Sequence, residues 1–217
     1  TGAAFASFAS RAARSFSLRA AAASALLCDL LGAGAGASAT GINAVYLGAR
    51  TAPGTGSTGT SSIAIGTDVA ATGDFSTALG FQTKGGGSAA IAMGYIATSS
   101  GVHAIAVGFQ SISTGLNSVY LGARSIAGTG ATADGAVALG TDVTSSGLSS
   151  LAAGTLAVAT AQNAVALGAG SNASGTNAIS LGYLSVTQGT ASIAMGQGAV
   201  VVGTGSSNAI AIGSVAT

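Results

Sequence analysis

The chain alternates large aliphatic and small side chains in short segments, and each segment ends at a glycine. Counted from this anchor glycine, the third and first places before it hold Val, Ile, Leu or Met with few exceptions, whereas the fourth and second places hold almost only Ala and Ser. This period of two, together with the β-branched content, predicts β-strands rather than helices. The twelve anchors are Gly48, Gly66, Gly80, Gly94, Gly108, Gly122, Gly140, Gly154, Gly168, Gly182, Gly196 and Gly213.

The anchors recur at a nearly fixed interval. Eight of the eleven intervals have the length of that from Gly80 to Gly94, and the three longer ones start at Gly48, Gly122 and Gly196. These three starts are equally spaced, so the short period is nested in a 74-residue super-repeat. A short period of this kind is typical of a solenoid, and about 14 residues accommodate two strands of roughly five residues and two tight turns. The sequence therefore predicts an all-β protein, a flattened parallel β-roll of about twelve 14-residue coils.

The two kinds of column predict two faces of each strand. We expect the large aliphatic side chains to fill the interior of the roll, and the small side chains to pack against another copy of the chain, because small residues let a second backbone layer approach closely. The candidate interface residues are Ala64, Ala78, Ala92, Ala106, Ala138, Ala152, Ala166, Ser180 and Ala194.

Stacking places equal positions of neighbouring coils beside one another. Phe81, Tyr95 and Phe109 each follow an anchor, and we expect them to form an aromatic ladder. Arg50 and Asp68 lie two places past successive anchors, and Arg124 and Asp142 occupy the matching positions of the next super-repeat. These pairs are either two salt bridges between coils or four solvated charges, and the sequence leaves both interpretations open.

Charge is scarce. Hydrophobic residues make up 48% of the chain and charged residues only 5%, against about 25% in a typical soluble domain. Burial between subunits would explain how so uncharged a chain avoids aggregation. The formal net charge is +1, and the repetitive part has no basic run, so the sequence does not indicate a nucleic-acid partner.

The first forty residues have a different composition, and we divide the chain into an N-terminal leader (1–40) and the repeats (41–217). Three arginines precede an apolar stretch that leads to Ala37, Ser38 and Ala39, the order found in a signal peptide cleaved after Ala39. An organelle transit peptide and an ordinary Ala-rich helix are the alternatives. Cys28 is the only cysteine, which excludes an intrachain disulfide. We expect the chain to be part of a longer protein.

The sequence contains little that could support catalysis. Residues 54–59 read GTGSTG, a literal GxGxxG, but a nucleotide fingerprint also needs a following helix, so we interpret it as a turn. His103 is the only histidine, and the four aspartates of the repeats do not form a regular calcium-binding ladder. We interpret Asn172, which begins an N-x-S sequon, as a product of the composition. We predict neither enzyme activity nor a metal or cofactor.

The phrases NAVALGAGSNASG, NAISLGYLSVTQG and SIAIGTDVAATG resemble the head repeats of the YadA-like trimeric autotransporter adhesins, and the resemblance covers residues 42–217. It implies a left-handed parallel β-roll that assembles as a homotrimer and is displayed on the bacterial cell surface, outside the outer membrane. It also implies extracellular-matrix proteins, cells or other surfaces as partners, and attachment to the membrane only through an anchor that a longer parent chain would carry.

Two other functions remain open at this point. A structural or receptor-binding fibre of a phage or virus can carry similar repeats, and the full-length gene would separate it from an adhesin. An ice-binding solenoid would require a regular flat ladder of threonines, whereas the threonines of this chain are scattered.

Overall fold

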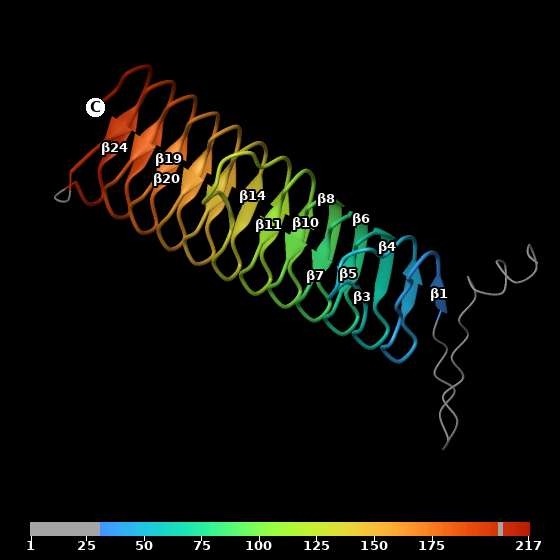
Figure 1. Cartoon of the computed structure of the whole chain (residues 1–217). Helices are drawn as coiled ribbons and strands as arrows, with labels where there is room; N and C mark the ends of the chain where they lie inside the picture. Colours follow the sequence, from blue (N-terminus) through green and yellow to red (C-terminus); the bar gives the residue numbers. More distant parts are fainter. Residues whose placement is uncertain (1–30, 204–205) are drawn as a thin grey trace, which may run out of the picture.

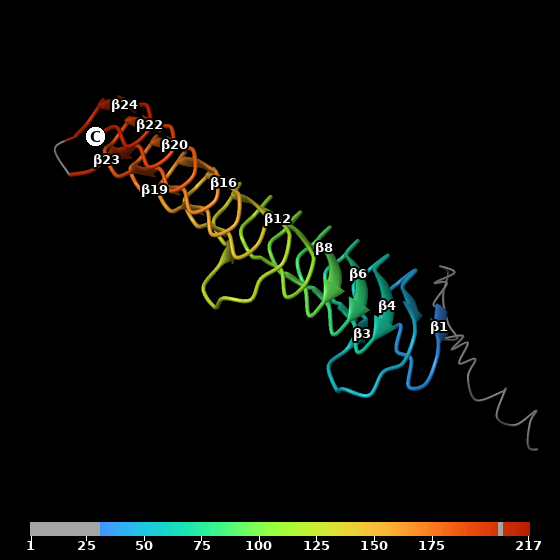
Figure 2. The same ribbon diagram turned by 90° about the horizontal axis from the view of Figure 1, so that it is seen from above.

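The computed structural model describes residues 31–203 and 206–217, and within them the chain forms an elongated parallel β-solenoid (Figures 1 and 2). All described coils but the first and the last contribute one strand to each of two sheets, which face each other across the interior of the roll. Sheet A contains thirteen strands and sheet B eleven among the described residues, and every strand pair is parallel. The predicted fold class, a parallel β-solenoid of short coils, is confirmed.

Sheet A is built from the strands that precede the anchor glycines. Its members are β1 (Leu31–Ala33), β2 (Val45–Leu47), β4 (Ile63–Thr67), β6 (Thr77–Phe81), β8 (Ile91–Tyr95), β10 (Ile105–Val107), β12 (Val119–Leu121), β14 (Val137–Leu139), β16 (Leu151–Ala153), β18 (Val165–Leu167), β20 (Ile179–Leu181), β22 (Ile193–Met195) and β24 (Ile210–Ile212).

Sheet B is built from two-residue strands that follow the anchors. They are β3 (Gly56–Ser57), β5 (Ala70–Ala71), β7 (Lys84–Gly85), β9 (Thr98–Ser99), β11 (Ile112–Ser113), β13 (Gly130–Ala131), β15 (Thr144–Ser145), β17 (Val158–Ala159), β19 (Asn172–Ala173), β21 (Val186–Thr187) and β23 (Val200–Val201).

The register of the sheets follows the repeat. Ile105 pairs with Ile91 and Ala106 with Ala92, so like residues stack on like residues along the roll. The stacking favours glycine at two points of the coil, although Ala133 and Ala161 replace it at the second point in two coils. Gly94, an anchor, adopts φ +132°, which side-chain-bearing residues rarely adopt. At Gly101, in the turn that closes the coil, a Cβ atom would collide with the carbonyl oxygen of Gly115 in the next coil.

The solenoid begins earlier than the sequence predicted. Strand β1 pairs with β2, with Leu31 opposite Val45, and Ala39 forms an isolated bridge with Ser57. Residues 31–40 therefore belong to the first coil, and the predicted boundary at residue 40 is wrong. The anchor of this coil, Gly34, is preceded by Leu30 and Gly32 at the two places where the other anchors have almost only Ala and Ser, so the sequence pattern does not identify this coil. The rest of the predicted leader, including Cys28, lies outside the described residues, and a cut after Ala39 would remove β1.

The assignment of the two strand faces is reversed in the structure. The small side chains point into the roll: the candidate interface residues Ala64, Ala78, Ala92, Ala106, Ala138, Ala152, Ala166, Ser180 and Ala194 are all 0% exposed in the single chain. A side chain enclosed by its own roll cannot contact a second chain, so these residues are not an interface between subunits. The large aliphatic side chains of the same strands point outward.

The roll is thin, which explains why its small side chains point inward and its large side chains point outward. Two strands joined by two tight turns leave space between the sheets for little more than methyl and hydroxymethyl groups. The hydroxyls of Ser113 and Ser118, which face each other across the roll, are 2.6 Å apart, and Ser145 and Ser150 repeat this contact at 2.7 Å. Where serine faces serine the buried hydroxyls satisfy each other, and the rest of the interior is mainly alanine.

No helix among the described residues combines the length and the apolar character needed to cross a membrane.

Candidate interaction surfaces

The outward face of sheet A is a continuous apolar surface, which we call the aliphatic face. It consists of the side chains three and one places before each anchor, from Val45 and Leu47 in β2 to Ile210 and Ile212 in β24. Eight of its side chains keep at least 36% of their surface exposed, among them Ile65 (37%), Leu121 (42%) and Leu167 (36%). A monomeric soluble protein rarely exposes a contiguous apolar patch of more than a few hundred Å², so a face along the whole roll indicates that something covers it.

The predicted aromatic ladder is confirmed, and it extends the aliphatic face at one edge. The ring centroids of Phe81 and Tyr95 are 5.2 Å apart with an angle of 9° between the ring planes, and those of Tyr95 and Phe109 are 5.4 Å apart with an angle of 4°. Strands β6 and β8 reach Phe81 and Tyr95, two places past Leu79 and Met93, so the rings share the outward face with these aliphatic residues.

Two coils carry protruding loops, visible on one side of the roll in Figure 2. The first loop follows Gly48 and returns to the roll at β3, and the second follows Gly122 and returns at β13. Asp68 of the next coil holds the first loop: its carboxylate accepts hydrogen bonds from the backbone N–H groups of Thr51 (2.5 Å) and Ala52 (2.8 Å) and from the Thr51 hydroxyl (2.7 Å). The loop is therefore ordered by the solenoid that it leaves.

The same arrangement returns at the second loop. The Asp142 carboxylate accepts hydrogen bonds from the N–H groups of Ser125 (2.5 Å) and Ile126 (2.8 Å) and from the Ser125 hydroxyl (2.7 Å). Hydrogen bonds to the charged form favour it, so the pKa of Asp68, chiefly through the N–H of Ala52, and that of Asp142, chiefly through the Ser125 hydroxyl, lie below the usual value.

These contacts replace the predicted salt bridges. Within the part of the chain that the structure describes, Arg50 forms no salt bridge with Asp68, nor does Arg124 with Asp142, although each arginine contributes a minor electrostatic lowering of its neighbour's pKa. Arg124 instead donates from Nε to the carbonyl oxygen of Thr129 (2.9 Å) within its own loop. The four residues share the positions that stacking predicts, but loop backbone groups occupy the carboxylate oxygens.

A tyrosine lies inside the roll at the base of each loop. Tyr46 and Tyr120 are 0% exposed and are the largest fully buried side chains among the described residues. Their hydroxyls donate to the carbonyl oxygens of Ala49 (3.0 Å) and Ala123 (2.9 Å), where the loops begin. Burial raises the pKa of both hydroxyls, which are therefore neutral donors. Tyrosine fits here because its hydroxyl reaches the loop-bearing edge of the coil.

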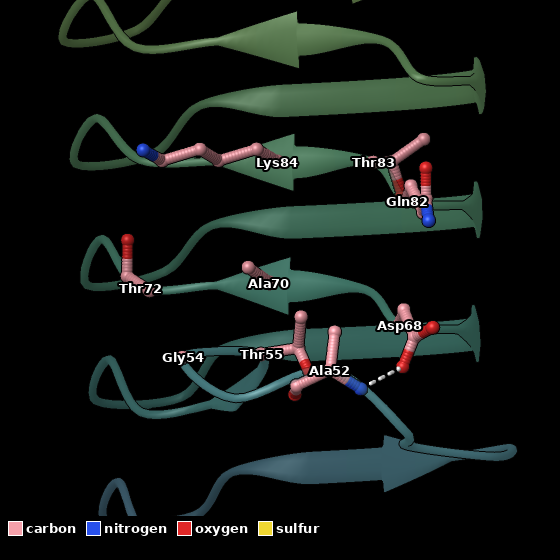
Figure 3. A pocket seen from close by; sticks show the side chains of 9 residues that line it. All are labelled: Ala52, Gly54, Thr55, Asp68, Ala70, Thr72, Gln82, Thr83 and Lys84. Atoms are coloured by element: carbon pink, nitrogen blue, oxygen red, sulfur yellow. Dashed lines mark hydrogen bonds between the residues drawn. The ribbon is translucent and has the colours of Figure 1, made fainter.

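A shallow groove of about 420 Å³ lies between the first loop and the outward side of sheet B (Figure 3). The ammonium group of Lys84 and the hydroxyl of Thr72 lie toward one end, and Gln82 and Asp68 lie toward the other. Sequence reasoning did not identify this groove, because loop and strands meet only in the fold. The loop contributes one wall and the strands the rest of the lining: Ala52, Gly54 and Thr55 from the loop, and Asp68, Ala70, Thr72, Gln82, Thr83 and Lys84 from the following coils.

The remaining motifs occupy turns and edges. The GxGxxG stretch forms the end of the first loop, strand β3 and the turn after it. His103 is exposed, and its Nδ1 lies 3.1 Å from Oδ1 of Asn117 in the next coil. Asn172 begins β19 and is half-buried. No group of three or more His, Cys, Asp or Glu side chains within residues 31–203 and 206–217 is placed to hold a metal ion.

The outward position of the aliphatic columns was not predicted, although one signal in the sequence could have indicated it. In most coils, positions five places apart match in polarity, with Ser57 and Ser62 or Ser113 and Ser118 in some coils and alanine at both places in others. Matching of this kind indicates side chains that face each other across an interior.

Comparison with known families agrees with the geometry. The chain matches the family model described as YadA head domain repeat (2 copies) over residues 52–83, 86–111, 99–128, 145–171 and 173–199, which together span more than half of its length. The matched segments include coils of the first super-repeat and of the second. No curated protein matches the chain.

Proposed function

Since the chain belongs to the family of YadA head domain repeats, we propose that it is the head of a trimeric surface adhesin, in which three rolls associate through their aliphatic faces. The family is one of structural adhesin repeats and points to an adhesin-type function rather than an enzymatic one. Such a head requires a rigid roll, one face that is covered by assembly and a second face that remains free for contact.

The observation that supports the trimer is the half-exposed aliphatic face of sheet A. Its side chains are large except at Thr77 and Ala153, they follow one another from coil to coil, and no described part of the same chain covers them fully. At the same time the interior is already filled by alanine and serine, so the roll cannot gain stability by turning these side chains inward. Association with further copies buries the face and leaves sheet B and the loops accessible.

The trimer would bind its target through several copies of the same surface at once. Three copies present three sets of loops and three outward sheets on one rigid body, and simultaneous contacts raise the apparent affinity without any deep pocket. We propose extracellular-matrix proteins, cell surfaces or other surfaces as the targets, and the bacterial cell surface as the place where the head is displayed. The small number of charged residues fits a body whose largest apolar surface is hidden between subunits.

Measuring the mass of the purified chain tests the assembly. The chain has a mass of 20.0 kDa, and we expect sedimentation equilibrium to give three times this value. The variant Val137→Asp places a charge in the aliphatic face and should shift the population to monomer, because an unpaired charge is costly at a buried interface. The matched control is Val158→Asp, an equally half-buried valine on the outward side of sheet B, which should leave the trimer intact.

A folded monomer of the unchanged chain would contradict the proposal, as would equal effects of the two substitutions. Binding of the trimer to immobilised matrix proteins, compared with binding of the Val137→Asp monomer, then tests the adhesin function separately. Loss of avidity on dissociation is the expected result. Equal binding by trimer and monomer would show that attachment does not depend on assembly.

A further inference from the structure

We propose that the groove beside the first loop binds an acidic sugar unit of a glycan, with Lys84 holding its carboxylate or sulfate group. This inference names a ligand class for the adhesin proposed above and rests on that function for its biological setting. The groove lies on the outward side of sheet B, whereas the aliphatic face lies on sheet A, so assembly through sheet A leaves the groove open.

Lys84 stands out in a chain with almost no charge. It is the only lysine in the sequence, it is exposed, and it forms no salt bridge within the described residues. At the equivalent position of other coils, sheet B carries neutral residues such as Ala70, Thr98 and Ile112. A free ammonium group at the end of a groove is a donor that an anionic group can engage by a charge-assisted hydrogen bond.

The rest of the groove provides uncharged polar groups. The amide of Gln82 and the hydroxyl of Thr72 line it, and neither forms a hydrogen bond through its side chain in the described structure. Thr83, which also borders the groove, is 1% exposed and its hydroxyl is buried, so Thr72 and Gln82 are the uncharged polar side chains that a ligand can reach.

The one acidic group of the groove, the Asp68 carboxylate, lies toward the end away from the Lys84 ammonium group (Figure 3). The carboxylate of Asp68 is directed to the loop, where two N–H groups and one hydroxyl occupy its oxygens. Its hydrogen bonds also fix the wall formed by Ala52 and its neighbours, so the groove is organised before a ligand arrives.

The polar lining and small floor favour a sugar over an acidic peptide. The floor of the groove is formed by the small side chain of Ala70, and its walls carry hydroxyl and amide groups. No large apolar side chain lines the groove that could receive a peptide side chain. A volume of about 420 Å³ lies in the range of small-molecule sites, which is roughly 300–1,000 Å³. A monosaccharide unit with one acidic group matches these donors and acceptors.

The second loop provides an internal control. The residues that match Gln82, Thr83 and Lys84 in the second super-repeat are Leu156, Ala157 and Val158, so the duplicated site retains its loop and loses all three polar side chains. The groove chemistry is therefore a property of the first loop and not of the repeat in general.

The experiment uses the single lysine as a probe. Reductive ¹³C-methylation of the full chain keeps the positive charge and labels Lys84 together with the N-terminal amine. The methyl resonance is followed by NMR while three oligosaccharides of equal length are added: one with carboxylates only, one with sulfates only and one neutral. We expect a saturable shift of the Lys84 signal with at least one acidic oligosaccharide and none with the neutral one.

Which acidic oligosaccharide binds decides between carboxylate and sulfate as the recognised group. The proposal is overturned if neither acidic oligosaccharide shifts the signal at about 10 mM, well above a millimolar dissociation constant. It is also overturned if the neutral oligosaccharide produces the same shift.

Two variants, measured by calorimetry, locate the site. Lys84→Val copies Val158, a residue that this sheet accommodates, and should weaken binding at least about tenfold. The double variant Leu156→Gln and Val158→Lys should raise the stoichiometry from one to two per chain. Unchanged affinity in the first variant would overturn the site, and unchanged stoichiometry in the second would overturn its assignment to these two side chains.

The mass measurement described above separates this proposal from the adhesin function. A trimer that ignores all three oligosaccharides would reject the glycan site and keep the adhesin head, whereas a monomer that binds them would do the reverse.

Discussion

The two loop-bearing coils share one framework and differ in what they display. The buried tyrosine, the aspartate with its three hydrogen bonds and the loop threonine recur with nearly equal distances: the Thr55 and Thr129 hydroxyls, for example, both donate to loop carbonyl oxygens at 2.8 Å. Side chains that support the loop are therefore repeated, while Lys84 at the groove has become Val158 in the copy. The two loops are therefore supported in the same way, but their different outward residues give them two different surfaces.

The supports of the two loops differ in the hydrogen bonding of their arginines. Nε of Arg124 donates to the carbonyl oxygen of Thr129, whereas Nε of Arg50 is buried without a hydrogen-bond partner. The first loop thus holds its arginine less well than the second. Substitutions can test whether the two loops are supported equally and whether their arginines differ.

The largest effect is expected from the buried tyrosines. Tyr46→Ala and Tyr120→Ala each leave a cavity in a roll that otherwise holds small side chains, and each should lower the free energy of unfolding by about 3–5 kcal/mol. Urea denaturation of the full chain measures the loss. Tyr→Phe at the same positions is the control, because it keeps the volume and removes only the hydroxyl hydrogen bond, at about 1 kcal/mol. A large loss of stability for one Tyr→Ala variant and none for the other would show that the two tyrosines do not support the two loops equally.

Acid should release both loops together. The pKa values of Asp68 and Asp142 are lower in the folded chain than the ordinary 3.8, so their contribution to stability is complete above that pH and is lost as the pH falls through the folded values. We expect the amide proton shifts of Thr51 and Ser125 to stay constant from neutral pH to about pH 4 and to change below it.

Asp68→Asn and Asp142→Asn provide the control for this titration. Each should abolish the acid transition at its own loop and leave the other loop unchanged, since each carboxylate contacts only one loop. A transition near neutral pH, or one confined to a single loop in the unchanged chain, would show that other groups hold the loops.

The smallest effects on stability are expected from substitution of the two arginines, and they should differ between the loops. Arg124→Met keeps much of the aliphatic stem and removes the hydrogen bond to Thr129, so it should cost about 0.5–1.5 kcal/mol. Arg50→Met removes an Nε that has no partner and should cost nothing by this route. Urea midpoints of the two variants can be compared directly. Equal losses would show that the arginines act through a contact that both loops share.

Much of the fold could be predicted from the residues because each coil repeats the same requirements. Period-two alternation identified the strands, the anchor glycines identified the turns, and equal positions such as Phe81 and Tyr95 stack as expected. Strand β1 could not be identified in this way, because its anchor Gly34 is preceded by Leu30 and Gly32 where the other anchors have almost only Ala and Ser.

The inside and the outside could not be assigned from alternation, since alternation separates two faces without saying which is enclosed. The usual rule, that large apolar residues are buried, fails when the enclosed space is thin. Ser76 illustrates the constraint: it faces Ala71 where other coils place a second serine, and its hydroxyl is buried without a partner. The groove could not be predicted either, because the loop that forms it approaches the two following coils only after the chain has folded.

The collision that a Cβ at Gly101 would cause with the next coil has a consequence for how genes of this kind can change. A side chain at Gly101 would force the neighbouring coil to shift as well, whereas an in-frame duplication of fourteen codons adds a coil that stacks on its neighbours as the original does. Each such event lengthens the protein by about 4.8 Å and creates no new contact to optimise. Length is thus the character that mutation can alter most freely, and a lineage can vary how far the head extends while every individual coil stays as it was.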